Sequence, residues 1–472
     1  MNRLPIVQVF FVSFMLGGCA TSAVERNATF VNTYAKANVG ASAKWQQSPQ
    51  DAAAQREFAA RLLAAPLTQD NAIKLALALS PAFQAMLSDG AALSAAATQS
   101  ARLANPIFTF ERLTRRDGGV VDIDIGRMLS VSLLEFITLP SRLKVAESIQ
   151  VQAQLRGAMN VVEMTDNVRQ AWVRAVAAQQ SLTYFEQVMD AAEASAELAK
   201  RLYKVGNFSK LQRARQQVFY ADAAAQFARA KQTALATREA LTRVLGLDAT
   251  LADKLQLPPR LPDLPSQPKS ETLVTQAAIE QRLDVQMAVA EINGLATKYG
   301  LSNLTSYVNV FHAAAIRNSE TGKPAQRGVE LALSIPLFDW GDAYRSQAQA
   351  QYLAATQRVL QTSINAASSV REQYAAWLTA YALSRHYRDE IVPLRKAIAD
   401  EMLLKYNGML SSVFDLLADT RAQISSVILA IDAERDFWLA DAALQASLLG
   451  KPIGGKTTAA ATVQMNDAAA GH

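Results

Sequence analysis

Hydrophobic and polar residues alternate over a short stretch in each half of the chain. Within 121–133, Ile123 and Ile125 alternate with Asp122 and Asp124. A period of two gives a β-strand one apolar and one polar face. The first stretch therefore predicts an amphipathic strand rather than a helix.

A partner strand is predicted beside each alternating stretch. Residues 105–116 precede the first one, and the Asp-Gly-Gly sequence at 117–119 is a strong turn signal. In the second half the two strands are 306–316 and 329–335, with a loop at 320–324. Each half of the chain is therefore expected to form one β-hairpin.

A very long helical pattern follows each hairpin. Residues 142–200 contain no proline and a single glycine, Gly157, while 344–405 contain a single proline, Pro393. At 1.5 Å per residue, roughly sixty residues make a helix of about 90 Å. Each hairpin is thus expected to continue into a long helical rod.

Both rods are predicted to turn back at a glycine that a serine follows three residues later. The first turn contains Gly206 and Ser209, and the second contains Gly408 and Ser411. Glycine can end a helix in a left-handed cap, and serine can cap the next helix. Each rod and its returning helix therefore form a helical hairpin with a tight tip.

A constant offset of 202 residues relates the two halves of the chain. It carries Gln84 onto Gln286, Gly126 onto Gly328, Ser132 onto Ser334, Gly206 onto Gly408 and Ser209 onto Ser411. A register held without a gap over this length indicates an internal duplication.

The N-terminus has the pattern of an exported precursor. A short basic start is followed by the apolar stretch 4–15 and by Leu-Gly-Gly-Cys at 16–19. This resembles a bacterial lipobox, which implies lipidation of Cys19, and Ala20 after it resembles outer-membrane sorting. The alternative is an ordinary signal peptide with an accidental cysteine.

These signals divide the chain into six predicted parts. They are a signal peptide 1–18, a lipidated N-terminal periplasmic segment 19–66, repeat 1 at 67–250, a proline-rich linker 251–269, repeat 2 at 270–450 and a flexible tail 451–472. Repeat 1 holds a first helix, a β-hairpin 103–135 and a long helical hairpin 142–247; repeat 2 holds a first helix, a β-hairpin 304–338 and a long helical hairpin 344–449.

Composition agrees with long, closely packed helices. Half of the 472 residues are hydrophobic and 7% are aromatic, while the net charge is +5 without a basic run. Nucleic-acid binding is not expected. Cys19 is the only cysteine, which excludes disulfides and thiolate metal sites in the rest of the chain.

Four strands from one chain leave two open sheet edges, and open edges are not viable in hydrocarbon. Strands with one apolar and one polar face nevertheless match a transmembrane barrel. Several copies would then have to contribute four strands each. The alternative is a pair of small soluble β-layers.

The order of elements, the lipobox and Ser-Ile-Pro-Leu-Phe-Asp-Trp-Gly at 334–341 resemble the TolC-like outer-membrane factor family of tripartite efflux systems. The resemblance covers about 67–450. It implies a mainly α-helical homotrimer, with a coiled-coil barrel in the periplasm and a twelve-stranded β-barrel in the outer membrane. The first copy lacks the proline and glycine of 334–341, so its strand-to-helix junction is expected to differ.

The resemblance also implies where functional residues lie. Asp415 and Asp419 would close the periplasmic end as rings of three, unless Asp419 only pairs with Arg421 or Arg215. The predicted adaptor-contact tips are Val205, Gly206, Asn207, Ser209, Asn407, Gly408, Met409 and Ser411. The predicted barrel-lumen residues are Asp122, Asp124 and Glu330, for which a role in solubility is the alternative.

No catalytic or metal site is predicted. Residues 450–457 match a phosphate-loop pattern, but the required strand before it and helix after it are missing. His312, His386 and His472 lack ligand spacing. The only expected non-protein group is the lipid on Cys19.

The leading hypothesis is a passive exit duct for small toxic solutes, drugs or metal ions, in the bacterial outer membrane. Its partners would be two further copies of the chain, a periplasmic adaptor, an inner-membrane pump and outer-membrane lipid. The alternatives are a non-conducting structural or secretion-assembly lipoprotein of the outer membrane and a periplasmic enzyme.

Overall fold

The computed structural model describes residues 18–269, 281–305, 310–335 and 337–451. The chain forms two compact units. The strand unit comprises 1–37, 85–158 and 285–362, and the hairpin unit comprises 38–84, 159–284 and 363–472. Both units take residues from both halves of the sequence, so they do not coincide with the sequence repeats.

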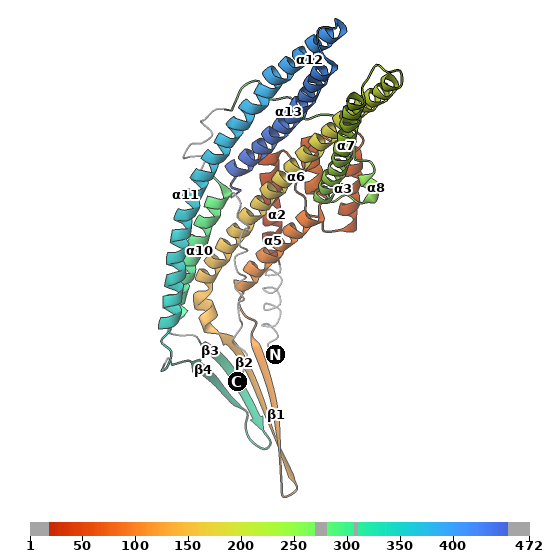
Figure 1. Cartoon of the computed structure of the whole chain (residues 1–472). Coiled ribbons are helices and arrows are strands. Elements are labelled where there is room, and N and C mark those ends of the chain that lie inside the picture. Colours follow the sequence, from red (N-terminus) through yellow and green to blue (C-terminus); the bar gives the residue numbers. More distant parts are fainter. Residues whose placement is uncertain (1–17, 270–280, 306–309, 336, 452–472) are drawn as a thin grey trace. The chain divides into compact units, whose positions relative to one another are not determined.

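The strand unit contains one antiparallel sheet in the order β1-β2-β3-β4 (Figure 1). The strands are β1 (Ile107–Asp117), β2 (Val120–Ser132), β3 (Phe311–Glu320) and β4 (Gln326–Leu333). Gly118 and Gly119 have φ angles of 56° and 88°, which explains the glycines in the tight turn between β1 and β2. The two expected hairpins are present, and β2 pairs with β3 to join them.

The register gives the sheet two chemically different faces. Residues directly paired across strands point to the same side, and side chains alternate along each strand. The polar face carries Glu111, Asp122, Asp124, Asn318, Glu320 and Glu330. The apolar face carries Phe108, Phe110, Ile123, Ile125, Leu129, Val131, Val329, Leu331 and Leu333, with arginines toward the hairpin turns.

The helices that contribute to the strand unit are α2 (Gly18–Val39), α5 (Pro81–Ser100), α6 (Leu133–Lys204), α10 (Leu283–Thr305) and α11 (Asp342–His386). Val31 of α2 lies where a Cβ on Gly157 of α6 would stand. The single glycine of the first rod therefore permits close approach of a neighbouring helix. Glu291 of α10 pairs with Arg358 of α11 (3.7 Å).

The two strand-to-helix junctions differ, as the sequence predicts. β2 runs directly into α6 at Leu133, so the first rod starts nine residues before the predicted position 142 and contains Pro140. Glu135 holds this junction, because it accepts from the amide of Ala104 (2.6 Å) and pairs with Arg142 (3.5 Å). In the second copy, β4 ends at Leu333 and α11 begins only at Asp342.

The hairpin unit contains α3 (Pro49–Leu62), α4 (Gln69–Leu79), α7 (Lys210–Leu245), α8 (Ala249–Ala252), α12 (Val392–Asn407) and α13 (Val413–Leu448), with the continuations of α6 and α11. The predicted first helix of repeat 1 is divided into α4 and α5 at Ser80-Pro81. Pro81 disfavours helical angles at Ser80, whose ψ is 117°. A π-helical turn, Tyr387–Ile391, precedes Pro393 and joins α11 to α12.

The core of the hairpin unit is aromatic where the proline-rich linker crosses it. Trp377, Tyr381 and Phe437 pack together, with Trp377 and Tyr381 stacked at 5.6 Å. Prolines leave the linker without regular structure, and its carbonyls instead accept from helix side chains. Tyr381 donates to Pro265 (3.1 Å) and Trp438 donates to Pro262 (3.0 Å). The linker is therefore fixed on the helices by side-chain hydrogen bonds.

Among the described residues, no helix is both long and apolar enough to span a membrane.

Candidate functional site

A left-handed glycine closes the first helical hairpin tip. α6 ends at Lys204, and the amide of Asn207 donates to the carbonyl of Leu202 (2.9 Å) across Gly206. Gly206 has a φ of 81°, and no atom lies within 4 Å of a Cβ built on it. The backbone angle, rather than crowding, therefore requires glycine at this position.

The second tip reaches the same geometry one residue later than expected. The amide of Leu410 donates to the carbonyl of Lys405 (2.8 Å), and the left-handed residue between them is Met409, with φ 58°. Gly408 has an ordinary φ of −80°. The predicted equivalence of Gly206 and Gly408 is wrong at the tip, because Met409 takes the position of Gly206.

The caps of the returning helices follow the same shift. Ser209 caps α7 in a capping box with Gln212, whereas Ser412 and Asp415 form the capping box of α13. The predicted cap at Ser411 is therefore wrong. An offset of 203 rather than 202 relates Ser209 to Ser412, and it also relates the last residue of α6, Lys204, to the last residue of α12, Asn407. Both turns contain five residues, so the extra residue of the second copy lies before its turn.

The predicted adaptor-contact residues cluster at these two tips. Val205, Gly206, Asn207, Ser209, Asn407, Gly408 and Met409 are exposed, and Ser411 is half-buried. Met409 is 93% exposed and Val205 is 70% exposed. Both tips thus present an apolar side chain to solvent beside exposed polar residues.

Asp415 serves the N-terminus of α13. Its Oδ2 accepts from the hydroxyl of Ser412 (2.6 Å), from the amide of Ser412 (3.2 Å) and from the hydroxyl of Ser411 (3.3 Å). These hydrogen bonds, led by the Ser412 hydroxyl, lower the pKa of the Asp415 carboxyl. The carboxylate is therefore held in its charged form at the tip.

Asp419 lies one helical turn further along α13 and is half-buried. In the part of the chain that the structure describes, it forms no ion pair. Arg421 instead stacks over the ring of Phe219 on α7 at 4.8 Å. The ion pair between Asp419 and Arg421 that the sequence suggested is therefore absent from the described residues. Positions 415 and 419 are four residues apart and share one face of α13.

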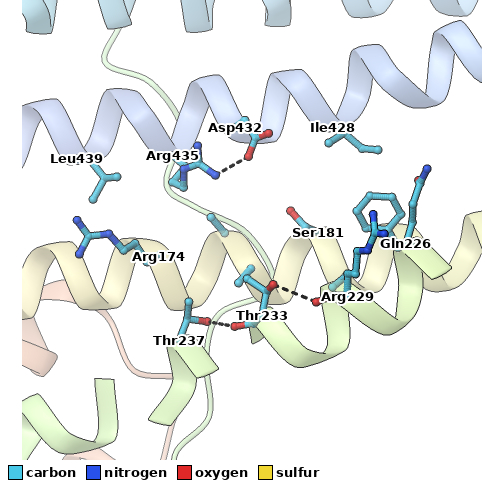
Figure 2. A pocket seen from close by; sticks show the side chains of 14 residues that line it. Arg174, Ser181, Gln226, Arg229, Thr233, Thr237, Ile428, Asp432, Arg435 and Leu439 are labelled. Carbon is cyan, nitrogen blue, oxygen red and sulfur yellow. Dashed lines mark hydrogen bonds and ion pairs between the residues drawn. The ribbon is translucent and has the colours of Figure 1, made fainter. Parts of the chain in front are cut away.

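A cavity of about 500 Å³ lies among α6, α7 and α13 (Figure 2). Its charged lining comes from Arg174, Arg229, Asp432 and Arg435, and Arg435 pairs with Asp432 at 2.6 Å. The sequence pattern did not predict this cavity. Arginine and small residues recur on α6 and α7 at helical spacing, which was the available signal.

A half-buried carboxyl lies beside the linker in the same unit. Desolvation, and then the nearby carboxylate of Asp263, raise the pKa of Glu434 on α13 to about 7. Gln180 hydrogen-bonds Glu434, and Arg260 partly opposes the shift. Glu434 thus titrates near neutral pH.

The predicted lumen residues share one face of the sheet. Asp122 pairs across from Arg115, Asp124 pairs across from Glu320, and Glu330 pairs across from Ala314. By the register all of them lie on the polar face. The structure thus places these three carboxylates on one face, with Glu330 in line with Ser130 of β2, six residues along the strand from Asp124.

The remaining predicted positions are only partly described. Cys19 lies at the start of α2, His386 pairs with Glu390 (3.2 Å), and His312 belongs to β3. Within the described ranges, no group of three or more His, Cys, Asp or Glu could hold a metal ion. The signal segment 1–17, His472 and the phosphate-loop match beyond Lys451 lie outside the described residues.

Solved structures with this fold include the outer membrane protein VceC and two outer membrane channels. VceC of Vibrio cholerae has a TM-score of 0.68 at 14% identity, with 81% of this chain and 96% of that chain covered. The CmeC outer membrane channel of Campylobacter jejuni has a TM-score of 0.66 at 15% identity, covering 85% and 86%. The MtrE outer membrane channel of Neisseria gonorrhoeae has a TM-score of 0.61 at 16% identity, covering 80% and 88%.

No curated protein matches the sequence. The sequence profile of the outer membrane efflux protein family matches residues 72–247 and 274–447, once in each half of the chain. These two matches confirm the internal duplication and the resemblance to TolC-like outer-membrane factors. The chain belongs to the outer membrane efflux protein family.

Proposed function

We propose that three copies of this chain form a passive duct through the bacterial outer membrane, the exit component of a tripartite efflux system. The observation that carries the proposal is the sheet register. It places Asp122, Asp124 and Glu330 on one face, and on the other a mainly apolar surface that carries arginines but no carboxylate. That arrangement suits a lipid-facing exterior and a water-filled lumen.

The open sheet edges support a trimer. β1 and β4 each pair with only one strand of the described sheet. Since β1 and β4 run in opposite directions, β4 of one copy can continue the antiparallel order onto β1 of the next. Three copies of a four-stranded sheet give twelve strands, an even number that leaves no edge in the hydrocarbon.

The N-terminus supplies an anchor in this proposal. Cys19 carries the lipid and fixes the start of α2 at the inner surface of the outer membrane. A single acyl group gives only marginal binding, so stable anchoring needs further acyl chains or the β-barrel itself. No cofactor and no catalytic step are required.

The exposed tips are the proposed contacts with the periplasmic adaptor. Val205 and Met409 offer apolar contacts, and the polar tip residues supply hydrogen bonds. An inner-membrane pump bound to the adaptor would provide the driving force. Cargo is assigned only as small toxic solutes, drugs or metal ions, because the pump selects it.

Asp415 and Asp419 are the proposed closure of the duct. In a trimer each would form a ring of three carboxylates, and such rings favour cations in a constriction. Asp415 would also retain its role in the capping box.

Single-channel conductance in planar bilayers tests the duct and its closure together. The variant is Asp415→Asn with Asp419→Asn, because Asn still accepts the capping hydrogen bonds. We expect a small cation-selective conductance for the unmodified trimer, and a larger, less selective one for the variant. Glu401→Gln, on the exposed surface of α12, is the matched control and should leave conductance unchanged.

Two outcomes would contradict the proposal. A folded, membrane-inserted trimer without conductance would favour the structural or secretion-assembly lipoprotein instead. If conductance and selectivity are unchanged in the double variant, the duct proposal stands, but Asp415 and Asp419 do not close the duct.

A further inference from the structure

Three arginines form a row across the apolar face of the sheet. The register pairs Arg127 of β2 directly with Arg317 of β3, and Arg317 directly with Arg327 of β4. Directly paired residues on neighbouring strands have their Cβ atoms about 5 Å apart and point to the same side. Three guanidinium groups therefore lie side by side, and we call them the arginine row.

Charges are separated between the two faces of the sheet. Five of the six arginines in the paired strands lie on the apolar face: Arg112, Arg116, Arg127, Arg317 and Arg327. No Asp or Glu of the paired strands lies on that face. The carboxylates of Glu111, Asp122, Asp124, Glu320 and Glu330 all belong to the polar face.

The arginine row is not neutralised within the protein. None of Arg127, Arg317 and Arg327 has an ion pair among the described residues, and Arg317 and Arg327 are exposed. Like charges directly opposite each other destabilise a sheet. An anion from outside the chain would therefore stabilise the row by reducing the repulsion between its guanidinium groups.

The row lies at the turn end of the apolar surface on β3 and β4, whereas β1 and β2 continue past it, with Ile125, Ile123 and Val121 on the same face. Arg327 is the second residue of β4, on the side of the hairpin turn, and Val329, Leu331 and Leu333 follow on the same face toward the helices. Six residues of strand span about 20 Å of apolar surface. Arginine on a lipid-facing strand is tolerated near the membrane surface and is costly at its centre.

Both hairpin turns lie at the end of the sheet away from the helices (Figure 1). If the helices are periplasmic, as the proposed function on which this inference rests requires, the row lies in the outer leaflet. The headgroups of the bacterial outer leaflet are phosphorylated glycolipids. Arginine binds phosphate in a bidentate manner, and long side chains reach headgroups from the edge of the hydrocarbon.

We propose that the arginine row, with Arg112 beside it, binds the phosphate groups of the outer-leaflet glycolipid. One phosphate can bridge guanidinium groups from two neighbouring strands. In the trimer the site would occur three times around the barrel.

Native mass spectrometry of the detergent-solubilised trimer with lipid A is the test. The variant replaces the row by Arg127→Gln, Arg317→Gln and Arg327→Gln. The matched control is Arg115→Gln, on the polar face of β1. We expect about tenfold weaker lipid A binding in the triple variant, and unchanged binding in the control. Dephosphorylated lipid A should bind the unmodified trimer at least as weakly as lipid A binds the triple variant.

Equal binding of lipid A to the triple variant and the unmodified protein would overturn the inference. Equal affinity for phosphatidylglycerol and lipid A would overturn the assignment to the outer leaflet. If the triple variant does not assemble, Arg317→Lys keeps the charge but removes the guanidinium fork, and should weaken binding severalfold. Conductance of the unmodified trimer separates the two proposals. If the unmodified trimer conducts but the triple variant binds lipid A as tightly as it does, only this inference is refuted and the proposed function stands.

Discussion

One backbone angle decides which residue each hairpin tip tolerates. Gly206 and Met409 both adopt left-handed angles, whereas Gly408, the glycine next to Met409, does not. Met409 is the only described residue other than glycine with a positive φ, and at 93% exposure it gains almost no packing in return. The second tip therefore contains local strain that the first tip avoids.

The two tip glycines should respond differently to the same substitution. Gly206→Ala should lower the free energy of unfolding by about 1 kcal/mol, because alanine is disfavoured in the left-handed region. Gly408→Ala should stay within about 0.5 kcal/mol, since a Cβ there meets only ordinary contacts at 3.5 Å or more. Thermal unfolding together with hydrogen exchange of the tip peptides measures both effects. Equal losses in the two variants would contradict the assignment of Met409 as the left-handed residue.

Glu434 should make the hairpin unit less stable as the pH rises. Its folded pKa of about 7 lies above the 4.5 of an exposed glutamate, so the folded protein holds the proton more tightly. Stability should therefore fall between about pH 4.5 and pH 7, as the half-buried carboxyl becomes charged. At pH 8, Glu434→Gln should be more stable than the unmodified protein by about 1 to 2 kcal/mol after solvent screening.

Urea unfolding at pH 4.5 and pH 8 tests this effect of Glu434. The stabilisation by Glu434→Gln should largely vanish at pH 4.5, where the unmodified side chain is already neutral. The exposed Glu401→Gln is the control and should show no such difference between the two pH values. A gain of the same size at both pH values would point to packing rather than to ionisation.

At the scale of elements, the sequence predicted what depends on neighbouring residues along the chain. Alternation predicted the strands, and the Asp-Gly-Gly turn predicted the tight connection between β1 and β2. The start of α6 at Leu133 was missed, because Pro140 is the eighth residue of α6, and proline is more typical of the first turn of a helix than of its interior. The groove in Figure 2 was missed because it depends on how α6, α7 and α13 pack together.

Gly157 is a second feature that depends on packing between helices rather than on neighbouring residues, and its role can be tested. Its function as a contact point for Val31 of α2 depends on a residue more than one hundred positions away, which periodicity does not reveal. Gly157→Ala should destabilise the strand unit by about 1 to 3 kcal/mol through overpacking. Combining it with Val31→Ala should recover part of that loss.

A double-mutant cycle on the thermal midpoint measures the coupling between positions 31 and 157. The two single variants and the double variant give the interaction energy directly. Additive effects would mean that α2 does not approach α6 at Gly157. Gly300→Ala, in α10 with open space around its Cβ, is a matched control and should not be destabilising.

At the scale of the whole molecule, the sheet is incomplete in one chain. β1 and β4 are its two edges, and β2 and β3 separate them. With neighbouring strands about 4.8 Å apart, β1 and β4 of one chain are about 14 Å from each other. A disulfide requires Cα atoms within about 7 Å, so a bond between β1 and β4 has to join two copies.

Cysteine cross-linking can therefore test the trimer directly. Thr109→Cys, Glu111→Cys and Leu113→Cys sample the polar face of β1 in steps of two residues, each combined with Glu330→Cys on the polar face of β4. Cys19 is the only native cysteine, so the background is low. Because neighbouring copies share one register, we expect one combination to give a reducible covalent trimer on denaturing gels. The control combines Ser130→Cys, on the inner strand β2, with Glu330→Cys and should give no covalent trimer. Monomers alone in every β1 combination would show that the sheet edges do not meet between copies.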